Sequence, residues 1–319
     1  MYSAGSGTIS RDESRGQWIL TLDDNVNKGA IVRLFILLLL FWIAPIHAAD
    51  SQSPIRFGLT AVVVTENLRF LDQWSQYLER KMDRKVELVL RKSYREIMDL
   101  LDSGNIDFAW ICGFPYIQTR EPESIQLLTV PVYRGAPRYH SYIIVPESSP
   151  HQKFSDLKGK LFAFSDPDSN SGFLYPLSLM VERDETPETF FRQTFFTFNH
   201  AETVQAVSEQ FADGGAVDSY IWEYLAIFRP EVTEKTRIIE KSPSFGFPPI
   251  VSRLGVNPNT VNLMKSTLED MDGDVDGQAL LAHLKLDGFG NYPDSLFNGI
   301  RAIANKVKTV DSSFSALTD

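Results

Sequence analysis

The decisive stretch of this sequence is Asp166-Pro167-Asp168-Ser169-Asn170-Ser171-Gly172. It follows residues 160–164, which are typical of a strand, and precedes residues 173–180, which are typical of a helix. The first N–H groups of a helix lack internal partners and carry the positive end of the helix dipole. The turn is therefore suited to hold a small oxyanion such as phosphate. The alternative is an ordinary helix cap, because Ser and Asn are favoured there in any case.

An alternation of strands and helices continues on both sides of this turn. Toward the N-terminus, apolar runs typical of buried strands lie at residues 56–63, 86–90 and 107–111. Helical patterns separate them, one of which begins with the capping box Ser93-Tyr94-Arg95-Glu96. Strands and helices in this order predict a parallel sheet with right-handed crossovers. Ligands of such sheets bind beyond the carboxyl ends of the strands, where we expect the turns at residues 61–67, 93–94 and 113–116.

A second set of strand and helix patterns occupies residues 154–247. A return segment, Pro248-Pro249-Ile250-Val251, then leads to the C-terminal helices. We therefore predict an α/β protein of two lobes with the ligand cleft between them. The first lobe comprises residues 54–145 and 250–319, and the second comprises residues 146–249, so the chain crosses between the lobes twice.

Residues 1–49 are predicted to be a leader followed by a signal peptide. Arg33 precedes an unbroken apolar run at residues 34–46, and small residues follow it, which is the order found in secretory signals. The run is shorter than the roughly 20 residues that span a bilayer. Cleavage would release the protein into the periplasm, and an uncleaved anchor is the alternative. Residues 1–31 lack a sustained apolar period, so the true start is predicted at Val32, the alternative being an unusually long leader.

Composition argues against nucleic acid as a partner and against a metal centre. The chain carries 31 Lys and Arg against 41 Asp and Glu, a formal net charge of -10, whereas nucleic-acid binding requires clustered basic residues. An anion site in this chain must therefore rely on local donors and dipoles. The single cysteine, Cys112, is expected to be buried, and the histidines lack the spacing of metal ligands. No metal or cofactor is predicted.

The sequence resembles the periplasmic phosphonate-, phosphate- and phosphite-binding proteins of ABC importers, the PhnD-like group of type II periplasmic binding proteins. The resemblance covers about residues 54–300. It rests on five segments in order, namely Ser93-Tyr94-Arg95-Glu96, Gly104-Asn105-Ile106-Asp107-Phe108-Ala109-Trp110, Asp156-Leu157-Lys158-Gly159-Lys160, the turn at residues 166–172, and Phe198-Asn199-His200. It implies a two-lobed Venus-flytrap fold that closes on its ligand by a hinge motion.

The resemblance also implies roles for residues of the second lobe. Ser169, Asn170 and Ser171 would lie at the helix N-terminus that holds the oxyanion. His200 would donate a hydrogen bond to another oxygen of the ligand, and a structural role at the start of its own helix is the alternative.

Four further residues are implied to lie at the ligand. Tyr94 and Tyr116 would reach it from the first lobe, or would be half-buried residues at the rim. Asp218 would accept a proton from the oxyanion or bind an amine, or else would cap the helix that follows it. Tyr220 stands where family members that bind aminoalkylphosphonates are expected to place a carboxylate. A bare oxyanion or a compact phosphonate is therefore favoured over an aminoalkyl ligand.

The predicted function is that of the solute-binding component of an ABC importer, which hands a phosphate-, phosphite- or phosphonate-like oxyanion to a membrane permease. The alternative is a sensory binding protein that reports the anion to a receptor kinase. An enzyme is not predicted, because the spacing of the sequence offers no convincing nucleophile beside a general base.

Overall fold

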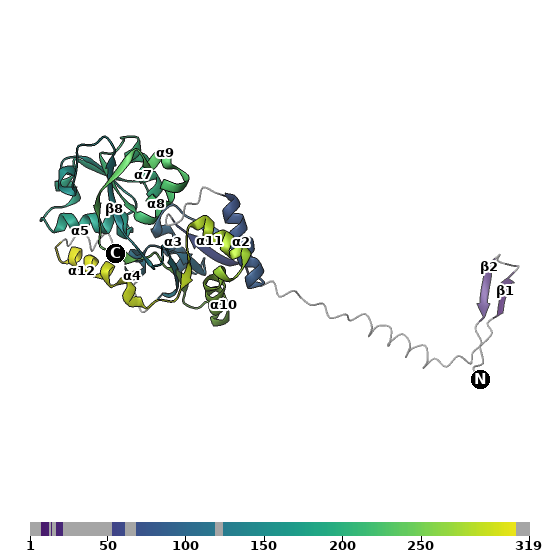
Figure 1. Cartoon of the computed structure of the whole chain (residues 1–319). Helices are drawn as coiled ribbons and strands as arrows, with labels where there is room; N and C mark the ends of the chain where they lie inside the picture. The colour runs from purple at the N-terminus through teal and green to yellow at the C-terminus, as the bar shows by residue number, and fades with distance from the viewer. Residues whose placement is uncertain are drawn as a thin grey trace. The chain divides into compact units, whose positions relative to one another are not determined.

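The computed structural model describes residues 8–12, 14, 17–21, 53–60, 68–118 and 124–310. The chain divides into two compact units, Met1–Gln52 and Ser53–Asp319 (Figure 1). In the first unit, β1 (Thr8–Asp12) and β2 (Gln17–Thr21) pair as an antiparallel hairpin. The predicted signal at residues 34–46, the predicted start at Val32 and the predicted rim turn at residues 61–67 lie outside the described residues.

The second unit contains a six-stranded sheet in the order β15-β6-β14-β5-β3-β4. Its strands are β3 (Ile55–Leu59), β4 (Val86–Leu90), β5 (Phe108–Trp110), β6 (Ile125–Val132), β14 (Ile250–Arg253) and β15 (Gly288–Gly290). β3 pairs in parallel with both β4 and β5, whereas β14 runs antiparallel to β5 and β6. The parallel strands predicted for the first lobe are therefore confirmed.

The helices that connect or follow these strands are α2 (Leu68–Met82), α3 (Tyr94–Asp102), α4 (Gly113–Gln118), α10 (Pro258–Glu269), η3 (Met271–Gly273), α11 (Val275–Leu284), η4 (Asp294–Phe297) and α12 (Asn298–Val310). The predicted capping box opens α3: Glu96 N donates to Ser93 Oγ at 3.2 Å, and Ser93 N donates to Glu96 Oε2 at 3.0 Å. Trp74 of α2 meets Trp110 of β5 edge-on, with 6.0 Å between the ring centroids. Burying side chains of this kind stabilises the fold by about 1.5–3 kcal/mol each, which holds α2 against the sheet.

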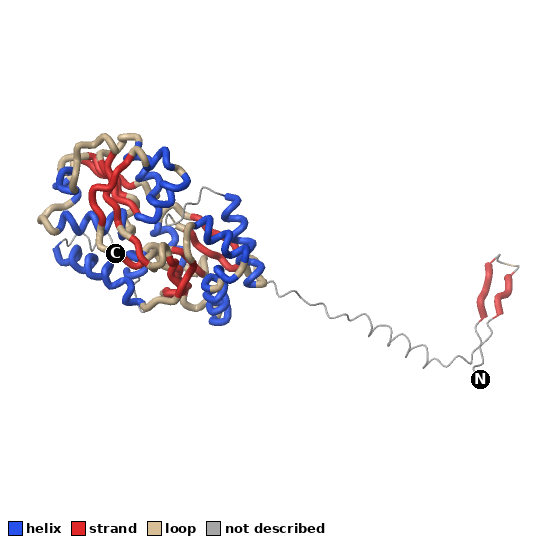
Figure 2. Tube along the Cα trace, in the orientation of Figure 1, coloured by secondary structure: helices blue, strands red, loops and turns tan. Residues whose placement is uncertain are grey.

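A five-stranded sheet in the order β10-β9-β11-β8-β12 forms the second half. Its strands are β8 (Ser141–Pro146), β9 (Leu161–Phe164), β10 (Gln193–Phe196), β11 (Gly214–Asp218) and β12 (Thr236–Lys241). Its helices are η1 (Phe154–Leu157), η2 (Asn170–Leu174), α5 (Tyr175–Val181), α6 (Pro187–Phe190), α7 (His200–Ser208), α8 (Ser219–Phe228) and α9 (Pro230–Thr233). Figure 2 shows helices flanking both groups of strands. The two-lobed α/β fold predicted from the sequence is therefore confirmed.

Two short strands mark the passages of the chain between the sheets. β7 (Arg138–Tyr139) pairs antiparallel with β13 (Phe245–Gly246). β8 then pairs with β11 and β12 of the second sheet, although the boundary predicted from the sequence assigned residues up to 145 to the first lobe. The apolar pattern of this strand identifies a buried strand but not its partners, so we propose moving that boundary to residues 138–140.

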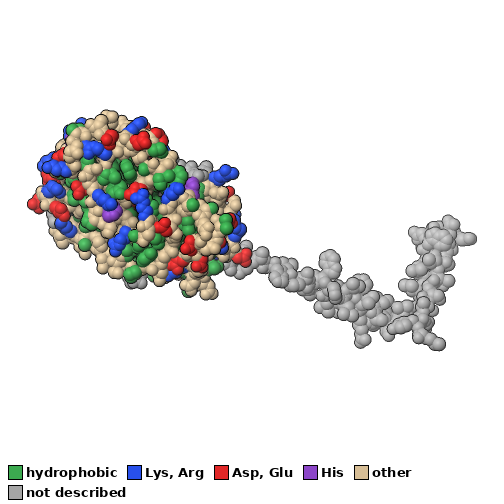
Figure 3. All heavy atoms as spheres, in the orientation of Figure 1, with side chains coloured by type: hydrophobic (Ala, Val, Ile, Leu, Met, Phe, Trp, Pro, Cys, Tyr) green, Lys and Arg blue, Asp and Glu red, His purple; other side chains and the backbone are tan. Residues whose placement is uncertain are grey.

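Side chains of both charges occur across the face of the molecule shown in Figure 3. No helix among the described residues is long and apolar enough to cross a membrane.

Candidate anion-binding site

The turn at residues 166–172 connects β9 to a helical segment. The π-helical turn η2 and the helix α5 follow each other directly, so the segment runs over residues 170–181. Ser169 is its N-cap, and Ser169 Oγ accepts a hydrogen bond from Gly172 N at 2.9 Å. A Cβ at Gly172 would lie 2.5 Å from the Cβ of Ser165, so glycine is required at that position. Ser169 thus has the structural capping role that the sequence left open.

Two polar atoms of this turn, Asn170 Oδ1 and Ser171 Oγ, are buried and make no hydrogen bond of good geometry among the described residues, although the Ser171 hydroxyl lies close enough to Tyr139 to lower the pKa of that tyrosine. Both residues have an exposed fraction of 0%. Their other groups are engaged: Asn170 Nδ2 donates to Tyr139 Oη at 2.9 Å, and the Ser171 carbonyl accepts from Ser141 Oγ at 2.6 Å. An unsatisfied buried polar atom costs about 1–3 kcal/mol. The start of the helical segment therefore presents polar atoms that a ligand is able to satisfy.

The two lobes meet beside this turn. The buried Asp166 carboxylate accepts a hydrogen bond from Asp168 N at 2.8 Å and from Tyr94 N of the first lobe at 3.2 Å. Burial raises the pKa of Asp166 to about 7, although both hydrogen bonds favour the ionised form. Arg95 Nε lies 3.3 Å from Asp168 Oδ2, which forms an ion pair between the lobes. A hydrogen bond and an ion pair thus link residues 94–95 of the first lobe to residues 166–168 of the second.

His200 begins α7 and reaches toward the first lobe. Its Nδ1 accepts a hydrogen bond from Asp218 N at 3.1 Å, so Nε2 carries the proton of the neutral ring. Nε2 lies 3.4 Å from Tyr94 Oη. Burial lowers the pKa of His200 to about 3, so the ring is neutral at neutral pH. The cap of α7 is Asn199, whose side chain accepts from Ala201 N and Glu202 N, so His200 does not serve as the N-cap.

Asp218 has the capping role that the sequence offered as an alternative. Its Oδ1 accepts from Tyr220 N at 2.7 Å at the start of α8. Burial raises the pKa of Asp218 to about 8. Burial also raises the pKa values of Tyr94 and Tyr139 well above the usual value, and the charge of Asp218 adds to both shifts. Asp218 therefore lies close enough to Tyr94 and Tyr139 to affect the pKa values of both hydroxyl groups. Together with His200, these residues form a buried cluster.

Two predicted tyrosines have hydroxyl groups with partners outside this cluster. Tyr116 Oη donates to Asp294 Oδ1 at 2.7 Å, and the Tyr116 ring lies 4.8 Å from that of Phe297. Tyr220 Oη donates to the Leu284 carbonyl at 2.7 Å. The other six predicted residues are buried, namely Tyr94, Ser169, Asn170, Ser171, His200 and Asp218. Of these, His200 contacts both Tyr94 and the backbone of Asp218.

Sequence reasoning missed two members of this cluster, Tyr139 and Cys112. Tyr139 accepts the hydrogen bond from Asn170 described above, and Cys112 Sγ accepts from Asn170 N at 3.2 Å. Cys112 is fully buried, as predicted, and burial raises its pKa to about 11. In the sequence, Tyr139 begins an apolar run that precedes the predicted crossing between the lobes, and this pattern does not indicate which residues its hydroxyl contacts. The described residues contain no group of three side chains able to hold a metal ion.

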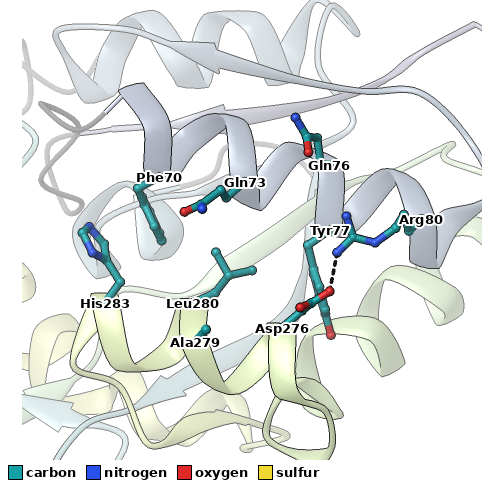
Figure 4. Close-up of a pocket in the computed structure, with 9 residues that line it drawn as sticks. All are labelled: Phe70, Gln73, Gln76, Tyr77, Arg80, Asp276, Ala279, Leu280 and His283. Carbon is teal, nitrogen blue, oxygen red and sulfur yellow. Dashed lines mark hydrogen bonds and ion pairs between the residues drawn. The ribbon is translucent and has the colours of Figure 1, made fainter.

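A separate cavity of about 280 Å³ lies between α2 and α11 (Figure 4). Arg80 Nη2 and Asp276 Oδ2 form an ion pair at 2.7 Å on its wall. The His283 ring stacks on Phe70 with 4.3 Å between the centroids. None of the predicted ligand residues lines this cavity, so it is distinct from the candidate anion site.

Residues 59–297 match the family described as "ABC transporter, phosphonate, periplasmic substrate-binding protein". The chain belongs to this family. The resemblance identified in the sequence is therefore confirmed, and membership implies a periplasmic location.

Similar proteins support the same assignment. The phosphonates-binding periplasmic protein of Escherichia coli K12 is 26% identical over 226 residues, which cover 68% of this chain and 66% of that protein, slightly less than two thirds of its length. A binding protein component of an ABC phosphonate transporter from Pseudomonas aeruginosa has a TM-score of 0.74 at 21% identity, covering 83% of this chain and 97% of that one. PhnD1 from Prochlorococcus marinus, solved in complex with methylphosphonate, has a TM-score of 0.69 at 18% identity, covering 80% and 98%. At these identities the two solved structures support the fold alone.

Proposed function

We propose that this protein is the solute-binding component of an ABC importer for phosphate-, phosphite- or phosphonate-like oxyanions, and that residues 169–171 hold the oxyanion. The observation that carries the proposal is the pair of buried atoms Ser171 Oγ and Asn170 Oδ1, which make no hydrogen bond of good geometry among the described residues, at the start of a helical segment. A hydroxyl group there is able to donate to an anionic oxygen, and the helix dipole favours negative charge at the same point.

The remaining groups of the cluster fit an oxyanion that carries one proton. Asn170 Oδ1 is an acceptor, so it would receive the proton of a monoprotonated phosphate or phosphonate. His200 would donate through Nε2 as a neutral ring, because its pKa is near 3. Sulfate carries no proton at neutral pH and would leave the Asn170 acceptor unsatisfied. The site should therefore discriminate against sulfate.

Isothermal titration calorimetry tests this proposal directly. Protein purified from the periplasm would be titrated with phosphate, phosphite, methylphosphonate and sulfate. We expect at least one of the first three to bind, and sulfate to bind at least tenfold more weakly, because leaving a buried acceptor unpaired costs about 1–3 kcal/mol. Absence of binding by all three phosphorus oxyanions would refute the ligand class, and equal affinity for sulfate would refute the role of Asn170.

The transport role and the export route have their own tests. A strain without the gene is expected to lose uptake of the ligand that calorimetry identifies. Retained uptake with a lost transcriptional response to the anion would instead support the sensory alternative. Export is proposed from the apolar run at residues 34–46. N-terminal sequencing of native protein should give a start near Asp50, and a retained Met1 or Val32 on membrane-bound protein would contradict it.

A further inference from the structure

A cavity of about 460 Å³ is lined by both lobes. This volume falls within the range of roughly 300–1,000 Å³ that is usual for small-molecule sites. The first lobe contributes the ends of β3 and β4, and the second contributes the turn into α7. The lining residues are Leu59, Thr60, Leu90, Arg91 and Lys92 from the first lobe, and Thr197, Phe198, Asn199 and Glu202 from the second.

The cavity adjoins the candidate anion site along two chain segments. Lys92 lies two residues before Tyr94, and Asn199 immediately precedes His200. Tyr94 and His200 are the two residues whose polar atoms meet at 3.4 Å within the buried cluster. The same two turns, one from each lobe, therefore form part of both the cavity and the buried cluster.

The lining of the cavity combines positive charge with apolar surface. Arg91 and Lys92 are exposed, and neither forms an ion pair with a carboxylate among the described residues. Among the described residues, Arg91 Nη1 donates to the neighbouring Leu90 carbonyl at 2.8 Å, and the Arg91 charge contributes to lowering the pKa of Glu96. Glu202 is the one acidic residue of the lining, so the two cations leave a net charge of +1.

Phe198 adds an exposed aromatic ring to this lining. Its exposed fraction is 42%, and its backbone has a φ of 57°, which is uncommon for a bulky residue. The cavity therefore offers an apolar wall and two cations without an ion pair among the described residues, on turns that continue into Tyr94 and His200 of the buried cluster.

We propose that this cavity receives the substituent of the ligand and selects organophosphonates or phosphate monoesters whose substituent ends in a second anionic group, such as a carboxylate. The inference rests on the proposed function, because the first anionic group is taken to lie at residues 169–171. The second group would pair with Arg91 and Lys92, and the chain between the two groups would contact Leu59 and Phe198.

The test compares methylphosphonate with 3-phosphonopropionate by calorimetry. We expect the wild-type protein to bind 3-phosphonopropionate roughly five- to tenfold more tightly, since two partly exposed ion pairs have a modest effect. The double variant Arg91→Gln/Lys92→Gln should lose this preference and keep its affinity for methylphosphonate within about twofold of wild type. The preference should also shrink as salt is raised.

A matched double variant separates local pairing from overall charge. Arg183→Gln/Lys308→Gln removes two exposed cations that do not line the cavity, and it should keep the preference. Equal wild-type affinity for the two ligands, or a preference that survives Arg91→Gln/Lys92→Gln, would overturn this inference while leaving the proposed function intact. Absence of binding by both phosphonates would also overturn this inference, and it would refute the proposed function only if phosphate and phosphite fail to bind as well.

Discussion

Replacing Ser171 by alanine should separate ligand binding from folding. Ser171 Oγ is buried and makes no hydrogen bond of good geometry among the described residues, so its removal takes no such bond from the unliganded protein. We expect the free energy of unfolding to stay within about 1 kcal/mol of wild type or to rise, since an unsatisfied buried group is lost. In the complex, the same hydroxyl would donate to a charged oxygen. Losing such a bond costs about 1.5–3 kcal/mol, which corresponds to roughly 10- to 150-fold in affinity.

Urea denaturation and calorimetry on each variant measure the two quantities. Ser178→Ala is the matched control, because Ser178 lies in the same helical segment, is 3% exposed and donates to the Tyr175 carbonyl at 2.7 Å. It should lower stability and leave affinity unchanged. Ser169→Ala should lower stability by about 1 kcal/mol through loss of the cap. Wild-type affinity in Ser171→Ala, or a loss of stability above about 2 kcal/mol, would refute the assignment of this hydroxyl to the ligand.

Three further predictions concern residues near the site. His200→Ala should weaken binding more than His200→Gln, because glutamine keeps a hydrogen-bond donor. At pH 7 neither variant should change how the heat of binding depends on the ionisation enthalpy of the buffer, because the His200 ring is already neutral. Tyr220→Phe should lower the free energy of unfolding by about 1 kcal/mol by removing the bond to Leu284, with affinity within about twofold in calorimetry. Asp218 binds a proton more tightly in the folded state, so its contribution to stability is fully present below about pH 4 and is lost as pH rises to about 8. Asp218→Asn retains a capping side chain, so its urea midpoint should fall less steeply than that of the wild type between pH 6 and 9. The same dependence of the midpoint on pH in both proteins would contradict the raised pKa of Asp218.

The sequence predicted the elements well because local patterns determine them. The capping box at Ser93 and the turn before Asn170 depend on neighbouring residues, and both form as expected. The pairing of β8 with β11 and β12, on which we base the proposed move of the lobe boundary, was not predicted, because strand pairing involves residues far apart in the chain. The orientation of a helical side chain is equally hard to predict: the hydroxyl of Tyr220 bonds to Leu284, 64 residues away. Tyr139 was missed for the same reason, since its link to Asn170 spans the crossing between the lobes.

The raised pKa values of two buried carboxyls would help an acidic protein to hold an anion at the proposed site. Asp166 and Asp218 have pKa values of about 7 and 8, so at neutral pH both are largely or partly protonated and repel an oxyanion less than ionised carboxylates would. A bound anion nearby raises both pKa values further, because it disfavours a second negative charge. Each carboxyl would then be a neutral donor in a cluster that also contains the neutral His200 ring. Attraction of an anion to the proposed site would therefore arise from oriented dipoles and hydrogen bonds, which the net charge of -10 does not prevent.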